Sequence, residues 1–396
     1  MLVSKPLKYA LRQSVWFLLT GLLFINSDLG LYRKPMISES MPTGGIDAKN
    51  LAVVINDNDP FSLEIGALYV KKRLIPSSQV IHLSLPVGVS EIPVSQFRWI
   101  LRDVNNRTPR HIQAFALAWT TPYRVGCQSI TSAFAYGIEP GLCQRSCQTT
   151  RLNPYYARGD VDRPWDQLKL RPTMLLAASN IDRAKELIHR GLASDGAAPK
   201  GTGYLMITSD PIRNSRASLY EESIRSVGNK FKLKIIHSDT LTNAKDVMTY
   251  FTGLTWVSKI NTNHFLPGAV ADHLTSFGGK LTDSGQMSAL RWLDAGATGS
   301  YGTVVEPCNY AAKFAHPGLL LTYYLRGDTL IEAYWRSVAM PGQGLFIGEP
   351  LARPWGPQAS KKFPFSSDAS GAKPMHGPES SPNPDSGDAS QVPDGP

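Results

Sequence analysis

Short apolar runs alternate with amphipathic stretches from residue 47 to residue 355. The run LAVVI at 51–55 is short and rich in branched side chains, which predicts a β-strand. Asp59 and Pro60 follow it, and this pair is typical of the N-cap and first position of a helix over FSLEIGALYVKKRL. The same patterns predict strands at 80–85, 112–119, 173–178, 203–208, 233–238, 298–305 and 344–348, and helices at 91–104 and 180–192.

This alternation of strands and helices indicates an α/β fold with a mostly parallel sheet and helices on both faces. Ligands of such sheets bind beyond the carboxyl ends of the strands. We therefore expect functional residues in four loops that follow strands, at 56–59, 120–124, 209–211 and 268–279.

The two ends of the chain differ from this body. Residues 1–27 place positive charges before the apolar run VWFLLTGLLFI, which is the order of a secretory signal peptide and is shorter than the ~20 residues that span a bilayer. The cleavage pattern is poor, so an uncleaved anchor is one alternative and a buried helix is another. Residues 28–46 are interpreted as a linker, and the Pro-, Ser- and Gly-rich residues 356–396 as a disordered tail. We expect an exported protein, periplasmic or secreted, with one α/β domain of one or two subdomains at 47–355.

Composition narrows the classes of partner and cofactor. The formal charge is +9, but no basic stripe interleaved with aromatic residues is present, which disfavours nucleic acid and leaves a weak preference for anionic membrane or envelope surfaces. In an exported protein, four cysteines indicate up to two disulfides, with three pairings open. Their spacing matches no zinc site, and we expect neither metal nor cofactor. The disulfide candidates are Cys127, Cys143, Cys147 and Cys308.

Two of the four loops carry candidate ligand-binding residues. The NDND stretch at 56–59 offers oxygen ligands for a hard cation, but the spacing of a calcium loop is absent, so a strand-to-helix turn capped by Asp59 is the favoured interpretation. The loop at 120–124 presents two hydroxyls and an arginine that could hold a carboxylate or phosphate; the alternative is a proline turn with an exposed arginine. The stretch at 208–211 favours a second helix-capping turn. The candidates are Asp57, Thr120, Thr121 and Arg124.

The stretch GAVADHLTSFGG at 268–279 concentrates the residue types of nucleophilic catalysis: a histidine as base, an aspartate to orient it, and two hydroxyls. Residues so close in sequence seldom align productively, and triads assemble from separate loops, so a partner from HPG at 316–318 or VVEPCNY at 304–310 would be needed, such as His316, Glu306 or Cys308. The alternative is a loop whose polar groups satisfy buried backbone. The catalytic candidates are Asp272, His273, Thr275, Ser276 and Glu306.

The order of elements resembles the gingipain-type cysteine peptidases. The opening LAVVINDNDPFSLEIGALYVKKRLIPSSQVIHLSLP, the segment EIPVSQFRWILRDV with IQAFALAWTTPYRV, and the close DTLIEAYWRSVAMPGQGLFIGEPLARP carry the similarity. It implies a caspase-like three-layer sandwich. The segments TTPYRV, DHLTSFGG and GATGSYGTVVEP more closely resemble a group of exported bacterial proteins of uncharacterised function, which implies no activity.

The chain departs from the peptidase pattern at both catalytic positions. These peptidases place His-Gly after one strand and Cys at the end of the next, and the matching segments are YFTGLTWV and GAVADHLTS. The His-Gly position then falls at Thr252 and Gly253, and the Cys position near Asp272 or His273. Loss of a nucleophile typically costs on the order of 10⁶ in kcat. Thr252 and Gly253 therefore join the candidates for ligand binding.

Three hypotheses follow. The leading one is an exported caspase-like protein that lacks the peptidase dyad and uses the cleft to bind a ligand or a protein partner. The second is a hydrolase with chemistry rebuilt around Asp272 and His273. The third is a structural envelope protein.

Overall fold

The computed structural model describes residues 45–144 and 147–357. The proposed signal or anchor, most of the linker, and the tail from residue 358 lie outside the described residues. In the part that is described, no helix is both long and apolar enough to cross a membrane.

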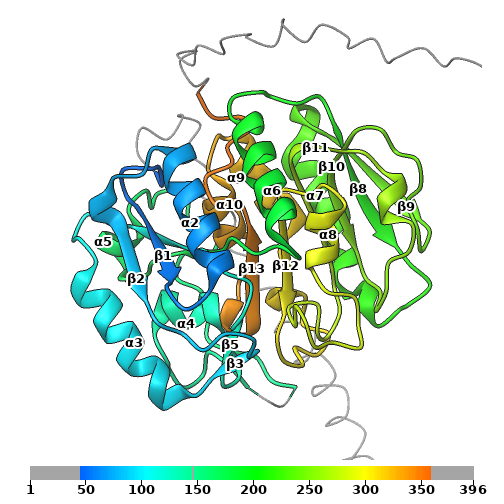
Figure 1. Cartoon of the computed structure of the whole chain (residues 1–396). Helices are drawn as coiled ribbons and strands as arrows, with labels where there is room; N and C mark the ends of the chain where they lie inside the picture. The colour runs from blue at the N-terminus through cyan, green and yellow to red at the C-terminus, as the bar shows by residue number, and fades with distance from the viewer. Residues whose placement is uncertain (1–44, 145–146, 358–396) are drawn as a thin grey trace, which may run out of the picture. The chain divides into compact units, whose positions relative to one another are not determined.

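A ten-stranded sheet forms the centre of the domain (Figure 1). Its ladders are parallel, apart from the antiparallel ladder between β12 and β13. In spatial order the strands are β2 (Val80–Leu83), β1 (Leu51–Asn56), β4 (Ala114–Leu117), β7 (Thr173–Leu175), β13 (Gly344–Gly348), β12 (Gly299–Thr303), β11 (Phe265–His273), β10 (Val247–Thr252), β8 (Thr202–Ile207) and β9 (Lys232–His237). A small second sheet contains β3 (Glu91–Ile92), β5 (Arg124–Val125) and β6 (Gln128–Ser129).

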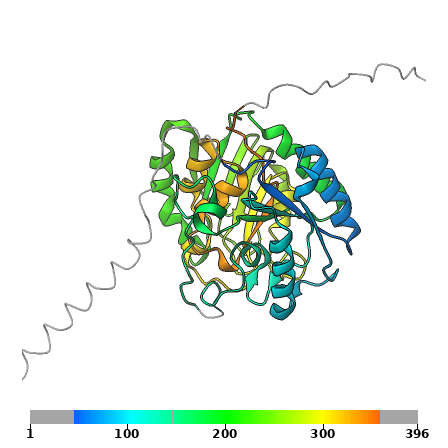
Figure 2. The ribbon, with the colours of Figure 1, turned by 90° about the vertical axis from the view of Figure 1, so that its left-hand side faces the viewer.

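Helices cover both faces of the large sheet. On one face α2 packs against α6 and α6 against α8, and on the other α9 packs against α7 and α10 (Figures 1 and 2). The α-helices are α2 (Pro60–Arg73), α3 (Val94–Arg107), α4 (Ile130–Tyr136), α5 (Pro164–Leu168), α6 (Ile181–Ser194), α7 (Tyr220–Val227), α8 (Leu290–Asp294), α9 (Pro317–Leu325) and α10 (Leu330–Ser337). The 3₁₀ helices are η1 (Ser77–Gln79), η2 (Arg213–Leu219), η3 (Gly228–Lys230), η4 (Ile260–Thr262), η5 (Ala311–Lys313) and η6 (Pro341–Gln343).

The α/β class and the mostly parallel sheet are confirmed, and most expected elements form close to their predicted bounds. Asp59 caps α2 as predicted, because its carboxylate accepts a hydrogen bond from the backbone N–H of Phe61 at 3.0 Å.

Two expectations about elements were wrong. The stretch 91–104 is not a single helix: Glu91 and Ile92 form β3, and the helix begins at Val94 after a proline, which cannot continue a strand ladder. The stretch 268–273 is not a loop but the second half of β11. It was misjudged because its polar residues are buried among specific partners, which a hydrophobic pattern does not reveal.

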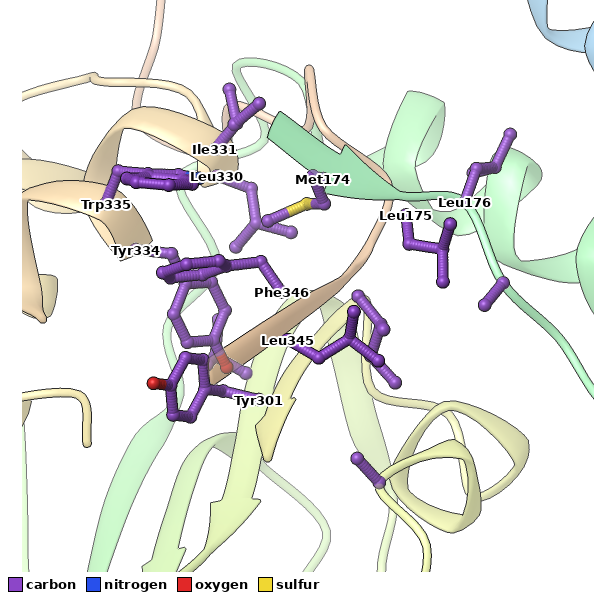
Figure 3. Close-up of a cluster of buried hydrophobic side chains, with 14 of the residues drawn as sticks. Met174, Leu175, Leu176, Tyr301, Leu330, Ile331, Tyr334, Trp335, Leu345 and Phe346 are labelled. Carbon is purple, nitrogen blue, oxygen red and sulfur yellow. The ribbon is translucent and has the colours of Figure 1, made fainter. Parts of the chain in front are cut away.

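Aromatic side chains pack the core beside the antiparallel pair of strands β12 and β13. Figure 3 shows Tyr301, Tyr334, Trp335 and Phe346 gathered between α10 and strands β12 and β13. Trp335 stacks on Phe346 with ring centroids 4.5 Å apart, and Tyr301 meets Phe346 edge-on at 4.9 Å. Offset and edge-on pairs of this kind add roughly 0.5–1.5 kcal/mol each beyond the area that they bury. This packing fixes β12, and with it the loop that follows β12.

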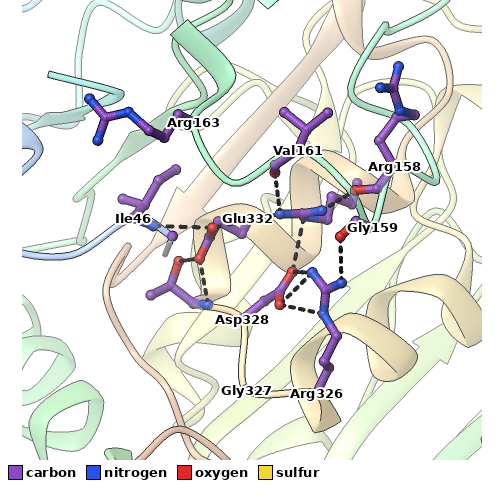
Figure 4. Close-up of polar contacts among 12 residues, drawn as sticks. Ile46, Arg158, Gly159, Val161, Arg163, Arg326, Gly327, Asp328 and Glu332 are labelled. Atoms are coloured by element: carbon purple, nitrogen blue, oxygen red, sulfur yellow. Dashed lines mark hydrogen bonds and ion pairs between the residues drawn. The ribbon is translucent and has the colours of Figure 1, made fainter. Parts of the chain in front are cut away.

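A buried polar cluster fastens the start of the described chain to α10 (Figure 4). Glu332 accepts hydrogen bonds from the backbone N–H of Ile46 at 3.2 Å and from the backbone and hydroxyl of Thr329 at 3.0 and 2.7 Å. Asp328 pairs with Arg326 at 2.9 Å and with Arg336 at 3.0 Å. Burial raises the pKa of Glu332, as does the nearby charge of Asp328, while Arg336 opposes the shift. The cluster satisfies charges that would otherwise be costly to bury.

Candidate functional site

The ends of β10 and β11 bring together the residues at the two positions that the resemblance assigns to the peptidase dyad. Thr252 lies beside His273 in the parallel ladder. The next residue, Leu274, donates its N–H to the carbonyl of Thr252 at 2.9 Å. Thr252, Asp272 and His273 are all buried. The two strand ends are therefore adjacent, but their side chains do not face solvent.

A buried ion pair occupies this position. Arg216 of η2 donates from Nη1 to Oδ1 of Asp272 at 2.5 Å and from Nη2 to the carbonyl of Thr252 at 3.0 Å. Its guanidinium also lies 4.9 Å from the ring centroid of Phe251. Burial raises the pKa of the Asp272 carboxyl, and the charge and hydrogen bond of Arg216 oppose that shift. Asp272 thus orients Arg216 rather than a catalytic histidine.

His273 is held by two partners through both ring nitrogens. The indole N–H of Trp292 donates to Nδ1 at 2.9 Å, so Nε2 carries the proton and donates to the carbonyl of Met287 at 3.0 Å. Burial lowers the pKa of His273 to about 4. A neutral imidazole with both nitrogens engaged has no free lone pair with which to accept a proton from a substrate.

The backbone of η2 covers the His-Gly position. A side chain at Gly253 would place its Cβ 2.0 Å from the carbonyl oxygen of Arg213, so only glycine fits at this distance. The hydroxyl of Thr252 is buried and has no hydrogen-bond partner within the described residues. Neither residue is open to a ligand in this structure.

A cavity of about 230 Å³ lies immediately beyond these sealed strand ends. It is formed by η2 with the residue before it, the turn after β11 and the loop after β12. Three of the catalytic candidates, Thr275, Ser276 and Glu306, line it. The full lining is Ile212, Arg213, Leu274, Thr275, Ser276, Glu306, Pro307, Cys308 and Asn309.

Two charged residues of the cavity are held in place by the backbone or by neighbouring side chains. Arg213 donates from Nη1 to Asp210 at 2.6 Å and from Nε to the hydroxyl of Thr275 at 3.3 Å. Oδ1 of Asp210 also accepts from the N–H groups of Ile212 at 3.1 Å and Arg213 at 3.0 Å, so Asp210 holds the turn that leads into η2, although the N-cap residue of η2 is Ile212. A second wall, the loop after β12, carries Glu306, whose Oε1 accepts from the N–H of Cys308 at 2.8 Å. Both walls therefore present charge in a fixed position.

The remaining ligand-binding candidates lie outside this cavity lining. Asp57 faces His82, with Oδ1 and Nδ1 2.6 Å apart. The hydroxyl of Thr120 donates to the carbonyl of Ala178 at 2.8 Å and accepts from its N–H at 3.1 Å, so it joins the ends of β4 and β7. Thr121 precedes a cis proline. Arg124 pairs with Glu91 across the small sheet at 2.8 Å.

The structure selects one of the three disulfide pairings. Cys127 bonds to Cys143, and Cys147 to Cys308. Cys308 lines the cavity, and its backbone has the left-handed value φ +55°, which costs a residue with a side chain roughly 1–3 kcal/mol and persists only when its surroundings hold it. The two disulfides are consistent with an oxidising, exported location. Among the described residues, no group of three or more His, Cys, Asp or Glu side chains is arranged to hold a metal ion.

A larger cavity of about 570 Å³ lies elsewhere, on the face covered by α6 and α8. Two of its polar side chains are already paired: Ser179 donates to Asp294 at 2.7 Å, and Arg183 donates to Glu186 at 2.8 Å. It contains none of the candidate residues. Changes at residues that line this cavity therefore serve as controls for changes in the 230 Å³ cavity.

Sequence reasoning missed both arginines of η2. Arg213 and Arg216 lie in TSDPIRNSR, which was interpreted only as a turn with a capping aspartate. The signal that could have indicated them is their place in the chain. The segment follows β8, and ligands of parallel sheets bind beyond the carboxyl ends of the strands.

Comparisons with known proteins add little to this geometry. No protein-family model matches the chain, and no curated protein matches it. A solved structure described as "Structure of Protease" is similar over 82% of this chain and 79% of its own, at 11% identity and a TM-score of 0.38. This likeness is too low to assign a family or an activity.

Removing either partner of the buried ion pair should destabilise the protein by about 3–5 kcal/mol, because an unpaired charge stays buried. We expect Arg216→Met and Asp272→Leu each to have this effect in urea denaturation, and the double variant to cost less than either single variant. The exposed pair Arg183–Glu186 provides the control, since exposed pairs contribute ~0–1 kcal/mol. Single changes at Arg216 or Asp272 no more costly than Arg183→Gln would contradict the role of this pair.

The disulfide at Cys308 should order the cavity wall. In the variant Cys147→Ser/Cys308→Ser we expect the amide of residue 308, which is hydrogen-bonded to Glu306, to exchange about tenfold faster or more, because the left-handed residue loses its tether. The variant Cys127→Ser/Cys143→Ser is the matched control and should leave exchange at residue 308 unchanged. Equal exchange at residue 308 in the two variants would show that the disulfide does not shape the cavity.

Proposed function

We propose that this chain is an exported binding protein with a caspase-like sandwich, and that the cavity beyond β11 and β12 holds a small polar ligand. The observation that carries the proposal is the contrast between two neighbouring regions. The position of the peptidase dyad is filled by Arg216, Asp272 and His273 in mutual or backbone contacts, whereas the cavity next to it is open and lined by oriented polar groups.

The size of the cavity supports a small ligand. Pockets for drug-sized molecules enclose roughly 300–1,000 Å³, and this one encloses about 230 Å³. It fits a small metabolite or the end of a longer chain. The parallel sheet, the antiparallel β12–β13 ladder and helices on both faces support the caspase-like description, and the two disulfides support export.

A hydrolase is the second candidate, and one observation favours it: Ser276 and Glu306 line the same cavity. A serine nucleophile needs a base within hydrogen-bond reach, and no histidine lines this cavity in the described part of the chain. Glu306 would have to serve as that base. Its Oε1 already accepts from Cys308, which leaves Oε2 for the task.

One pair of assays separates the two candidates. We expect the full chain to leave peptide, ester and glycan substrates intact, and Ser276→Ala to change nothing in those assays. We also expect acetate and glycine, titrated at millimolar concentration, to shift NMR signals of residues 212–213, 274–276 and 306–309.

The variant Ser276→Phe should fill the cavity and abolish these shifts, while Ser179→Phe in the 570 Å³ cavity should not. Turnover that disappears in Ser276→Ala would instead establish the hydrolase. Shifts that survive Ser276→Phe would contradict binding in this cavity.

A further inference from the structure

We propose that the ligand of the 230 Å³ cavity is a small zwitterion, an α-amino acid, whose carboxylate binds Arg213 and whose ammonium binds Glu306. This inference rests on the proposed binding function and names the chemistry of the ligand. The basis is that one small cavity presents a fixed cation and a fixed anion that are not paired with each other.

The two charges come from different loops. Arg213 begins η2, after β8, and Glu306 lies in the loop after β12. Within the described residues the ion-pair partner of Arg213 is Asp210, and Glu306 forms no ion pair. Two opposite charges that line one cavity without bonding to each other can be bridged by a ligand that carries both signs.

Arg213 has donors to spare. A guanidinium carries five N–H groups, and the two bonds to Asp210 and Thr275 use one on Nη1 and the one on Nε. The remaining donors include both N–H groups of Nη2. The side chain is 23% exposed, so it lines the cavity wall without being sealed. Such a fixed guanidinium suits a planar carboxylate.

Glu306 has an acceptor to spare. The bond from the Cys308 N–H holds Oε1 and leaves Oε2 for a ligand ammonium. The hydroxyl of Ser276 and the amide of Asn309 line the same cavity and can take further hydrogen bonds. The disulfide to Cys147 and the hydrogen bond from the Cys308 N–H both restrain the loop that carries Glu306.

An apolar part of the lining provides for an amino-acid side chain. Ile212 and Leu274 contribute to the cavity, and Ile212 is 57% exposed. An aliphatic side chain of the ligand that contacts Ile212 would bury apolar surface of the ligand and of Ile212, which favours binding. We therefore take leucine as the probe.

Three matched probes test the inference on the full chain: L-leucine, N-acetyl-leucine with the carboxylate alone, and leucine methyl ester with the ammonium alone. We expect leucine to bind at least tenfold tighter than either by NMR titration, since a charged hydrogen bond contributes about 1.5–3 kcal/mol. Arg213→Gln should abolish the preference over the ester, and Glu306→Gln the preference over N-acetyl-leucine. Arg183→Gln, in the other cavity, should change neither preference.

Two results would overturn the inference in distinguishable ways. Binding of N-acetyl-leucine as tight as leucine, with shifts at the same cavity residues, would refute the zwitterion and leave the cavity as the binding site. Shifts that fall outside residues 212–213, 274–276 and 306–309 for all three probes would refute both the zwitterion and the proposed binding cavity.

Discussion

The buried ion pair between Arg216 and Asp272 is the constraint on which this end of the sheet depends. A carboxylate at the end of β11 is taken fully out of water, and this arrangement persists only because a guanidinium meets it at 2.5 Å. Arg216 must therefore lie over the ends of β10 and β11. Because Arg216 is part of η2, this contact also sets the position of η2. The same requirement brings the backbone of Arg213 onto Gly253 and its side chain into the cavity. One pair thus seals the ends of β10 and β11 and builds a wall of the adjacent cavity.

The second wall of the cavity, the loop after β12, depends on a different constraint. The loop after β12 is held by the packed aromatic core beneath β12 and β13 and by the disulfide from Cys147 to Cys308. Cys308 is kept in a left-handed conformation, and its N–H fixes Glu306. The two walls are far apart in sequence and rigid for unrelated reasons. A cavity between two rigid walls is preorganised, which lowers the entropic cost of binding a small ligand.

Sequence patterns predicted the elements but not the contacts that decide the site. LAVVI and the Asp59–Pro60 pair predicted β1 and α2 because both signals are local. Arg216 was missed because its partner lies 56 positions away, and no periodicity links them. The disulfide pairing was open for the same reason, since Cys147 and Cys308 are 161 positions apart.

The ends of β10 and β11 are sealed, and His273 is a structural residue there. NMR of the protein with ¹⁵N-labelled histidine reports the protonation of each ring nitrogen directly. We expect His273 to stay neutral from about pH 7.5 to about pH 5, with the proton on Nε2, because burial lowers its pKa to about 4. Titration of His273 near 6.5, the value for an exposed histidine, would show instead that its imidazole is open to solvent.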